Sequence, residues 1–132
     1  MEKLRYDAAT KAFDTLKDIL NEPFTIIVRD ATIQRFEYTF EALWKFLKAW
    51  LKEREGIICN SPKACFREAF PLGLLTEEET IKFLEMTDDR NMTSHTYHEE
   101  ISQILYVRMP SYCKLIGNLL ERIEESYVVS RI

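Results

Sequence analysis

The stretch that decides the fold is DATIQRFEYTFEALWKFLKAWLKE, which runs from Asp30 to Glu53. Large apolar residues recur through it at helical spacing: Ile33, Phe36, Phe40, Leu43, Trp44, Leu47, Trp50 and Leu51. Polar residues fall into a second stripe: Gln34, Glu41, Lys45, Lys48 and Lys52. This spacing is typical of an amphipathic helix with a wide apolar face. We therefore expect one long helix here that packs against others.

Two apolar residues of this stretch, Ala42 and Phe46, lie outside the apolar stripe. They leave two interpretations open, either a homodimer or partner interface, or an ordinary core with one exposed aromatic side chain. Trp44 lies within the stripe, so its replacement by alanine is predicted to destabilise the protein by on the order of 3 kcal/mol. The charged run from Lys48 to Glu55 is most simply a solvated helix face.

Helical patterns also predict the elements on either side. A first helix is expected from about Glu2 to Leu20, and Asn21-Glu22-Pro23 ends it. The β-branched run Phe24–Arg29 has no partner strand elsewhere, so we assign it to the approach of the long helix. Gly56 marks the end of that helix, and Pro62 starts a short helix that reaches about Phe70.

In the second half of the chain, Thr76-Glu77-Glu78-Glu79 has the pattern of a capping box, and the helix after it should reach about Met86. Asp88 or Asp89 is expected to cap the next helix, and Pro110 to kink or restart it before a last helix through about Tyr127. The predicted fold is all-α, an up-and-down helical bundle with four main helices plus short ones.

Composition limits the class of protein. A chain of 132 residues is long enough for one domain with a modest core. Its formal net charge of -4 argues against non-specific coating of nucleic acid, which needs a basic surface, although a small local phosphate site is compatible with it. The apolar runs are shorter than the roughly 20 residues that span a bilayer, and the first residues lack a signal-peptide core. We therefore expect no membrane contact and a cytoplasmic location.

The chain has three cysteines, Cys59, Cys65 and Cys113, and no CxxC pair. An odd number without such a pair suggests neither a disulfide framework nor a zinc site. Free, partly buried thiols are the expectation.

The residues that point to chemistry are RNMTSHTY, at positions 90–97. They place a fixed cation (Arg90), an imidazole (His95) and a phenol (Tyr97) close together, at the predicted start of a helix. An arginine can neutralise a phosphate, a histidine can move a proton near neutral pH, and a tyrosine hydroxyl can accept a transferred group. The substrate class that this set suits is a nucleotide or RNA.

The spacing R-x4-H-x-Y, with Asn91 directly after the arginine, resembles the signature of the HEPN superfamily. Two earlier blocks, DATIQRFEYTFEALWK at residues 30–45 and AFPLGLL at residues 69–75, accompany it in order. Together they resemble the HepT-like subgroup, the helical substrate-binding partners of minimal nucleotidyltransferases. The resemblance covers nearly the whole chain and implies a single helical HEPN-like domain over residues 1–132.

The motif has a geometric difficulty if the helix is regular. Tyr97 would then share a face with Arg90 and Ser94, whereas His95 would lie on the neighbouring face with Asn91. A single site that uses both His95 and Tyr97 would need an irregular helix or a dimer.

Structural roles are the alternative for the same residues. Tyr97 could be a ring at the edge of the core, and His95 a surface residue that holds Glu99. Arg90 could form an ion pair with Asp88, Asp89 or Glu85, and exposed pairs of this kind contribute little. His95, His98 and Glu99 have a spacing that could bind a metal, yet no further ligand cluster accompanies them. We predict no metal site and no cofactor.

The resemblance implies a binding partner within a toxin-antitoxin-type pair rather than a complete enzyme. A separately encoded cognate nucleotidyltransferase would supply the metal-binding carboxylates, because this chain lacks a Gly-Ser followed by an acidic pair and has no phosphate-cradling glycine loop. The chain would bind or present the acceptor, with Asn91, Ser94 and Tyr97 as contacts. In HepT-like proteins the motif tyrosine is itself a target of adenylyl transfer, and Tyr97 is the matching position.

The alternative is a metal-independent endoribonuclease, the toxin of a toxin-antitoxin pair, as many HEPN proteins are. RNA cleavage by the 2′-hydroxyl needs a proton acceptor, a proton donor and a cation, which His95 and Arg90 can supply. One such histidine per chain favours a two-fold homodimer with both motifs at one cleft. Adenylylation of Tyr97 would then block RNA. The acidic balance and the lack of a basic stripe favour the binding partner, and enzymatic activity stays open.

Overall fold

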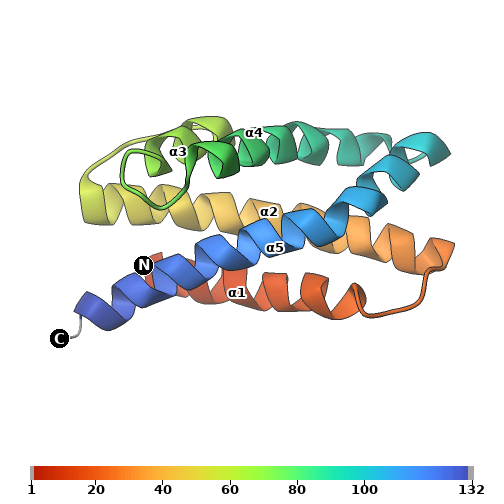
Figure 1. The fold of residues 1–132 in the computed structure, drawn as a ribbon, viewed down its shortest axis with the longest axis horizontal. Helices are drawn as coiled ribbons and strands as arrows, with labels where there is room; N and C mark the ends of the chain where they lie inside the picture. Colours follow the sequence, from red (N-terminus) through yellow and green to blue (C-terminus); the bar gives the residue numbers. More distant parts are fainter. Residues whose placement is uncertain (1, 131–132) are drawn as a thin grey trace.

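The computed structural model describes residues 2–130. Its helices are α1 (Glu2–Ile19), α2 (Ile26–Glu55), α3 (Pro62–Ala69), α4 (Glu77–Met92), the short 3-10 helix η1 (Thr93–His95) and α5 (Glu99–Ser130). α1, α2 and α4 lie side by side in alternating directions, and α5 crosses them diagonally (Figure 1). Within residues 2–130 there is no strand, and none of the helices is long and apolar enough to span a bilayer. The predicted all-α, up-and-down bundle is confirmed.

α2 lies at the centre of the bundle because apolar side chains cover more than one of its sides. On one side Phe40 packs on Phe66 of α3 with ring centroids 5.9 Å apart, and Phe66 stacks on Phe83 of α4 at 4.7 Å. On another side Phe46 is fully buried and meets the ring of Tyr6 from α1 edge-on at 5.3 Å. The expectation of an exposed aromatic at position 46 is wrong, because α1 packs along that side. Phe46 therefore gives no support for an interface.

The ends of α2 follow local rules. Thr25 is its N-cap, and the hydroxyl of Thr25 accepts a hydrogen bond from the backbone nitrogen of Val28 at 2.9 Å. The β-branched residues from Ile26 therefore form the first turn of the helix, four residues before the predicted start at Asp30. Gly56 ends the helix with φ 67°, a left-handed conformation that glycine adopts without strain. This predicted end is confirmed.

The capping box before α4 is also confirmed. The Thr76 hydroxyl accepts a hydrogen bond from the Glu79 backbone nitrogen (3.1 Å), and a Glu79 carboxylate oxygen accepts one from the Thr76 backbone nitrogen (2.9 Å). The predicted end of this helix at Met86 is wrong, however. α4 continues through Asp88 and Asp89 to Met92, so neither aspartate is a cap.

Two further boundaries differ from the prediction. The motif of residues 90–97 lies at the end of α4 and in the turn after it, not at a helix start. Pro110 lies inside α5, so the predicted restart is wrong and the alternative, a kink at Pro110, stays a prediction. One continuous helix therefore runs from this turn along the whole bundle.

The prediction of free thiols holds for one cysteine of three. Cys113 is free and buried, and burial raises the pKa of its thiol. Cys59 and Cys65 form a disulfide, because the loop after Gly56 folds back so that their Cα atoms are 5.3 Å apart. The prediction considered only CxxC spacing, whereas these two residues are six positions apart.

Candidate functional site

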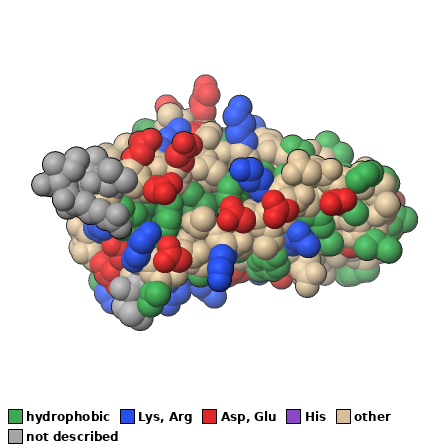
Figure 2. Space-filling view, turned by 90° about the horizontal axis from the view of Figure 1, so that it is seen from below, with side chains coloured by type: hydrophobic (Ala, Val, Ile, Leu, Met, Phe, Trp, Pro, Cys, Tyr) green, Lys and Arg blue, Asp and Glu red, His purple; other side chains and the backbone are tan. Residues whose placement is uncertain are grey.

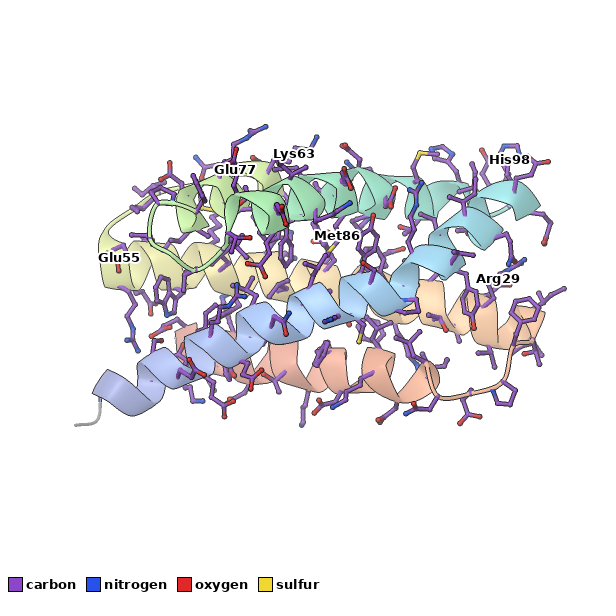
Figure 3. The ribbon with its side chains drawn as sticks, in the orientation of Figure 1. Arg29, Glu55, Lys63, Glu77, Met86 and His98 are labelled. Carbon is purple, nitrogen blue, oxygen red and sulfur yellow. A yellow bond between two sulfur atoms is a disulfide. The ribbon has the colours of Figure 1, made fainter. Side chains whose placement is uncertain are left out.

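The candidate site is the corner where α4 turns into α5, at one end of the bundle. Figure 3 shows this corner with His98 labelled on it. The backbone nitrogen of His98 donates to the carbonyl oxygen of His95 at 3.1 Å, and the Ser102 hydroxyl donates to the carbonyl oxygen of Thr96 at 2.8 Å. These bonds satisfy carbonyl groups that a helix end leaves unpaired. The corner is therefore a defined turn with its own hydrogen bonds.

The turn brings His95 and Tyr97 together. Nδ1 of His95 and the hydroxyl oxygen of Tyr97 are 3.2 Å apart, and the Tyr97 and His98 rings have centroids 4.4 Å apart. Tyr97 is 75% exposed, so it is not a ring at the edge of the core. A regular helix would separate the two side chains, but the 3-10 turn and the bend after it remove that separation. A site that uses both His95 and Tyr97 was predicted to need either an irregular helix or a dimer, and the irregular turn brings the two side chains together within a single chain.

Arg90 is held by α2 rather than by its own helix. Its Nε donates to Oε1 of Glu41 at 3.1 Å, and the indole Nε1 of Trp44 donates to the other oxygen of the same carboxylate at 3.1 Å. The Thr93 hydroxyl lies 2.9 Å from a Glu37 carboxylate oxygen and 2.7 Å from the Arg90 carbonyl oxygen. The expected pairing of Arg90 with Asp88, Asp89 or Glu85 is wrong, because the guanidinium reaches across to the polar stripe of α2.

A small cavity lies beneath this network. It has a volume of about 100 Å³ and is lined by Asp30, Glu37, Thr93 and Thr96, together with Ile33 and Gln34. Such a space holds a few water molecules and not a nucleotide. A ligand of the corner would therefore bind on its outer surface.

Arg29 anchors the start of α5. Its guanidinium is buried and donates to both carboxylate oxygens of Glu99, at 2.7 and 3.1 Å, and to Asp30 at 3.0 Å. The hydrogen bonds that Arg29 donates to Glu99 lower the pKa of the Glu99 carboxyl and raise the pKa of the arginine. Figure 3 shows Arg29 at the same end of the bundle as His98. Glu99 is thus occupied by Arg29 instead of His95, and it is not free to complete a metal site with His95 and His98.

The other predicted contacts, Asn91 and Ser94, are both exposed on the outside of the corner. The Ser94 hydroxyl donates to the carbonyl oxygen of Asn91 at 3.3 Å. Both residues are placed where a ligand could reach them, and their roles stay predictions.

Sequence reasoning missed a second polar cluster, which joins α4 to α5 next to the corner. Arg108 of α5 donates to both carboxylate oxygens of Asp89 at 2.8 Å, and the Tyr112 hydroxyl donates to the same carboxylate. Burial, and then the bond to Asp89, raise the pKa of Tyr112. The partners are 19 and 23 residues apart along the chain, so no local pattern could have paired them. Glu37 and Glu41 did carry a signal, because they lie in the block of residues 30–45.

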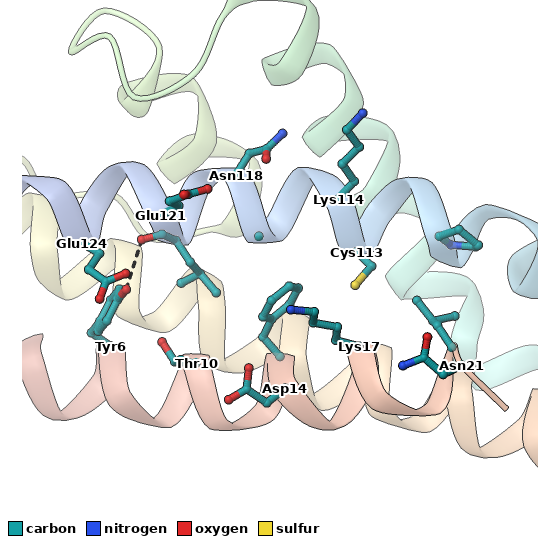
Figure 4. A pocket seen from close by; sticks show the side chains of 15 residues that line it. Tyr6, Thr10, Asp14, Lys17, Asn21, Cys113, Lys114, Asn118, Glu121 and Glu124 are labelled. Carbon is teal, nitrogen blue, oxygen red and sulfur yellow. Dashed lines mark hydrogen bonds between the residues drawn. The ribbon is translucent and has the colours of Figure 1, made fainter.

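Two further surface features lie outside residues 90–97, one between α1 and α5 and one at the corner end of the bundle. A groove of about 640 Å³ lies between α1 and α5, and its lining includes Asp14 and Lys17 from α1 and Lys114 and Glu121 from α5 (Figure 4). Its charges are mixed and select no ligand class. Hydrophobic side chains gather toward the corner end of the molecule (Figure 2), and the exposed ones at the start of α2 are Phe24, Ile26 and Ile27.

Comparison with known proteins gives consistent matches. A family model described as "Nucleotidyltransferase substrate binding protein like" matches residues 4–125. A curated Haemophilus influenzae protein named "Probable ribonuclease HepT" is 30% identical over 97 residues, which is 70% of this chain, and the chain spans 65% of that relative's length.

Solved structures share the fold. A crystal structure of a Thermus thermophilus protein is 47% identical with a TM-score of 0.83, covering 86% of this chain and 97% of that one. A Haemophilus influenzae structure, described as the fold of a substrate binding domain of a nucleotidyltransferase, is 24% identical with a TM-score of 0.77, covering 90% and 98%. At that identity the second likeness supports the helical fold alone.

Proposed function

Because this chain belongs to the family of nucleotidyltransferase substrate-binding-like proteins, we propose that it is the helical partner of a separately encoded minimal nucleotidyltransferase and that Tyr97 is an acceptor for the transferred nucleotidyl group. One observation carries the proposal. The Tyr97 hydroxyl lies 3.2 Å from Nδ1 of His95, on a side chain that is 75% exposed. An acceptor must reach another protein's active site, and a neighbouring base must take its proton.

The transfer step uses groups that the corner and the partner enzyme supply. The Tyr97 oxygen attacks the α-phosphorus of ATP bound by the nucleotidyltransferase, a new phosphorus–oxygen bond forms, and the bond to the leaving pyrophosphate breaks. The His95 imidazole accepts the phenolic proton at Nδ1. Arg90 lies in the last turn of α4, at the base of the same corner, where its guanidinium is held by Glu41. The exposed apolar side chains at this end of the bundle support docking of a partner protein there.

The test is a labelling experiment with the purified cognate nucleotidyltransferase, Mg²⁺ and ATP labelled on the α-phosphate. Wild type should gain label at Tyr97, identified by mass spectrometry, whereas Tyr97→Phe should gain none and His95→Ala should be labelled at least tenfold more slowly, within the range for loss of a general base. Tyr38→Phe is the matched control, since Tyr38 is also exposed but lies on α2. Label on wild type at another residue would overturn the proposal.

A second candidate function is metal-independent endoribonuclease activity. The relative named "Probable ribonuclease HepT" favours it. In this case His95 moves the proton and Arg90 neutralises the phosphate. In a homodimer, His95 and Arg90 of both copies would lie at one cleft. Together with the nucleotidyltransferase, the protein would then form a cytoplasmic toxin-antitoxin system in which modification of Tyr97 stops RNA cleavage.

The two functions separate in one assay. Structured RNA is incubated with wild type, His95→Ala and Arg90→Ala in chelator, without ATP or partner, and sedimentation measures the oligomeric state of each. Cleavage by wild type alone supports the ribonuclease, whereas a folded dimer that leaves RNA intact supports the partner function only.

A further inference from the structure

A basic groove lies between α1 and α2, and none of its lining residues belongs to the motif of residues 90–97. It has a volume of about 500 Å³, and its lining comes from α1 and α2 alone. The lining residues are Arg5, Trp44, Lys45, Lys48, Ala49, Lys52 and Glu53. Three of them, Lys45, Lys48 and Lys52, share one face of α2 because they are spaced by three and four positions. The sequence alone predicts a solvated face for these lysines, and what the fold adds is Arg5, brought in from α1.

The cations of this groove are poorly neutralised. Among the described residues, Arg5, Lys48 and Lys52 have no carboxylate within ion-pair distance, and Lys45 reaches Glu41 only at 3.9 Å. The acidic lining residue, Glu53, accepts a hydrogen bond from the backbone nitrogen of Glu2. Like charges at these helical spacings destabilise a helix. Four cations with two acidic neighbours, Glu41 and Glu53, therefore leave a local excess of positive charge on a chain whose formal net charge is -4.

An aromatic face lies among these cations. Trp44 is half-buried, and the ammonium of Lys48 lies 5.9 Å from the centre of its ring. If Lys48 binds the phosphate of a nucleotide, the base of that nucleotide can reach the indole ring of Trp44. Non-specific single-strand binders likewise combine a positively charged groove with aromatic side chains on which bases stack.

The groove is joined to the motif through a single carboxylate. Trp44 donates to one oxygen of Glu41, and Arg90 donates to the other. From Lys45 to Lys52 the helix rises about 10 Å, at roughly 1.5 Å per residue. The three lysines thus form a row along α2, and Glu41 lies between the end of this row and Arg90.

We propose that this groove, formed by Arg5, Trp44, Lys45, Lys48 and Lys52, binds single-stranded RNA and directs the strand toward the corner that carries Arg90 and His95. Its lysines take successive phosphates and Trp44 stacks on a base. The inference deepens the ribonuclease candidate by supplying a substrate-binding surface, and it names the strand rather than a mononucleotide as ligand. Binding does not require cleavage, so the two can fail separately.

The experiment is fluorescence anisotropy with a labelled single-stranded RNA of about 12 nucleotides, in the His95→Ala background so that the probe stays intact. The triple variant Lys45→Gln, Lys48→Gln and Lys52→Gln should bind at least tenfold more weakly. Its salt dependence, log K against log salt, should be shallower by about 2, because each phosphate contact contributes about 0.7 for single strands. Lys11→Gln, an exposed lysine of α1 outside the groove, is the matched control and should bind as the parent does.

Trp44 provides an independent measurement. RNA should quench the tryptophan emission of the His95→Ala parent, and in that background Trp44→Phe should retain most of the affinity and Trp44→Leu should lose several-fold while circular dichroism stays unchanged. Inorganic polyphosphate of matched charge should bind more weakly than RNA. An unchanged affinity in the triple variant, or equal affinity for polyphosphate, overturns the inference. Labelling of Tyr97 by the nucleotidyltransferase is measured on the same lysine variants and should be unaffected, so a failure there counts against the proposed function alone.

Discussion

The centre of α2 and the corner between α4 and α5 are stabilised by different kinds of contact. At the centre, rings such as Phe40, Phe66 and Phe83 pack on one another and are fully or almost fully buried. At the corner, exposed side chains are positioned by hydrogen bonds and ion pairs to residues far away in the sequence, such as Arg29 to Glu99. Stability therefore resides mainly in the first region, and the proposed chemistry belongs to the second. Substitutions should separate the two.

The largest effect is expected at the centre. Phe40→Ala should lower the free energy of unfolding by about 4 kcal/mol, because Phe40 is 1% exposed and truncation leaves a cavity. Trp44→Ala should lower it by only about half as much, since Trp44 is half-buried. This revises the value near 3 kcal/mol predicted from the sequence. Urea denaturation of both variants measures the difference, and equal losses would contradict the packing described.

The cluster beneath the corner should give the next largest effect. Asp89→Ala leaves the buried Tyr112 hydroxyl without its acceptor and should cost about 2 kcal/mol. The neighbouring Asp88→Ala removes an exposed ion pair with Lys63 and should cost less than about 0.5 kcal/mol. Thermal melts of the two variants measure this difference in stability. Equal losses for Asp88→Ala and Asp89→Ala would contradict a structural role for the cluster around Asp89.

A smaller, pH-dependent effect is expected at Glu79. The hydrogen bond from Arg122, 2.6 Å long, lowers the pKa of Glu79 below its ordinary value of 4.5. A carboxyl whose pKa is lower in the folded state stabilises the protein above the unfolded pKa, and this contribution is lost as pH falls through the folded pKa. Glu79→Gln keeps an acceptor for the Thr76 cap, so it should lose about 1 kcal/mol at pH 7 and progressively less as the pH falls below 4.5 and Glu79 becomes protonated. Urea midpoints across this range test the sign, and a gap that stays constant with pH would exclude the ion pair as its cause.

The smallest effect on stability is expected at the corner itself. Tyr97→Phe and His95→Ala should each change the free energy of unfolding by less than about 0.5 kcal/mol, because both side chains are exposed. The same two variants carry the largest expected losses in the labelling assay. A loss of stability comparable to that of Asp89→Ala would show that the corner is structural.

The sequence predicted what depends on local spacing. The periodicity of residues 30–53, the left-handed Gly56 and the capping box at Thr76 are local properties, and the structure has all three. The predicted cap at Asp88 or Asp89 was wrong because it relied on the frequency of aspartate at helix starts. In the structure the Asp89 carboxylate instead accepts hydrogen bonds from Arg108 and Tyr112 of α5. The disulfide between Cys59 and Cys65 likewise depends on how a loop turns, which residue types alone do not specify.

The candidate site divides in the same way. The motif identified Arg90, His95 and Tyr97 by residue type, but its regular-helix geometry placed His95 and Tyr97 apart. The residues that position them, Glu41 and Arg29, come from α2 and lie 49 and 70 positions from their partners. Such contacts form only when the helices pack together. The sequence therefore predicted which side chains could carry the chemistry, but not which distant residues hold them in place.

The pairing of Arg29 with Glu99 determines how Tyr97 would be presented to the proposed partner enzyme. Tyr97 lies on a short segment fixed at both ends, by Thr93 against α2 on one side and by the two bonds from Arg29 to Glu99 on the other. The phenol is therefore presented as part of a folded epitope and not as a tyrosine in a flexible peptide. An enzyme that modifies it would select its target by three-dimensional shape, and a free peptide that copies residues 90–99 would be a poor substitute for the whole domain.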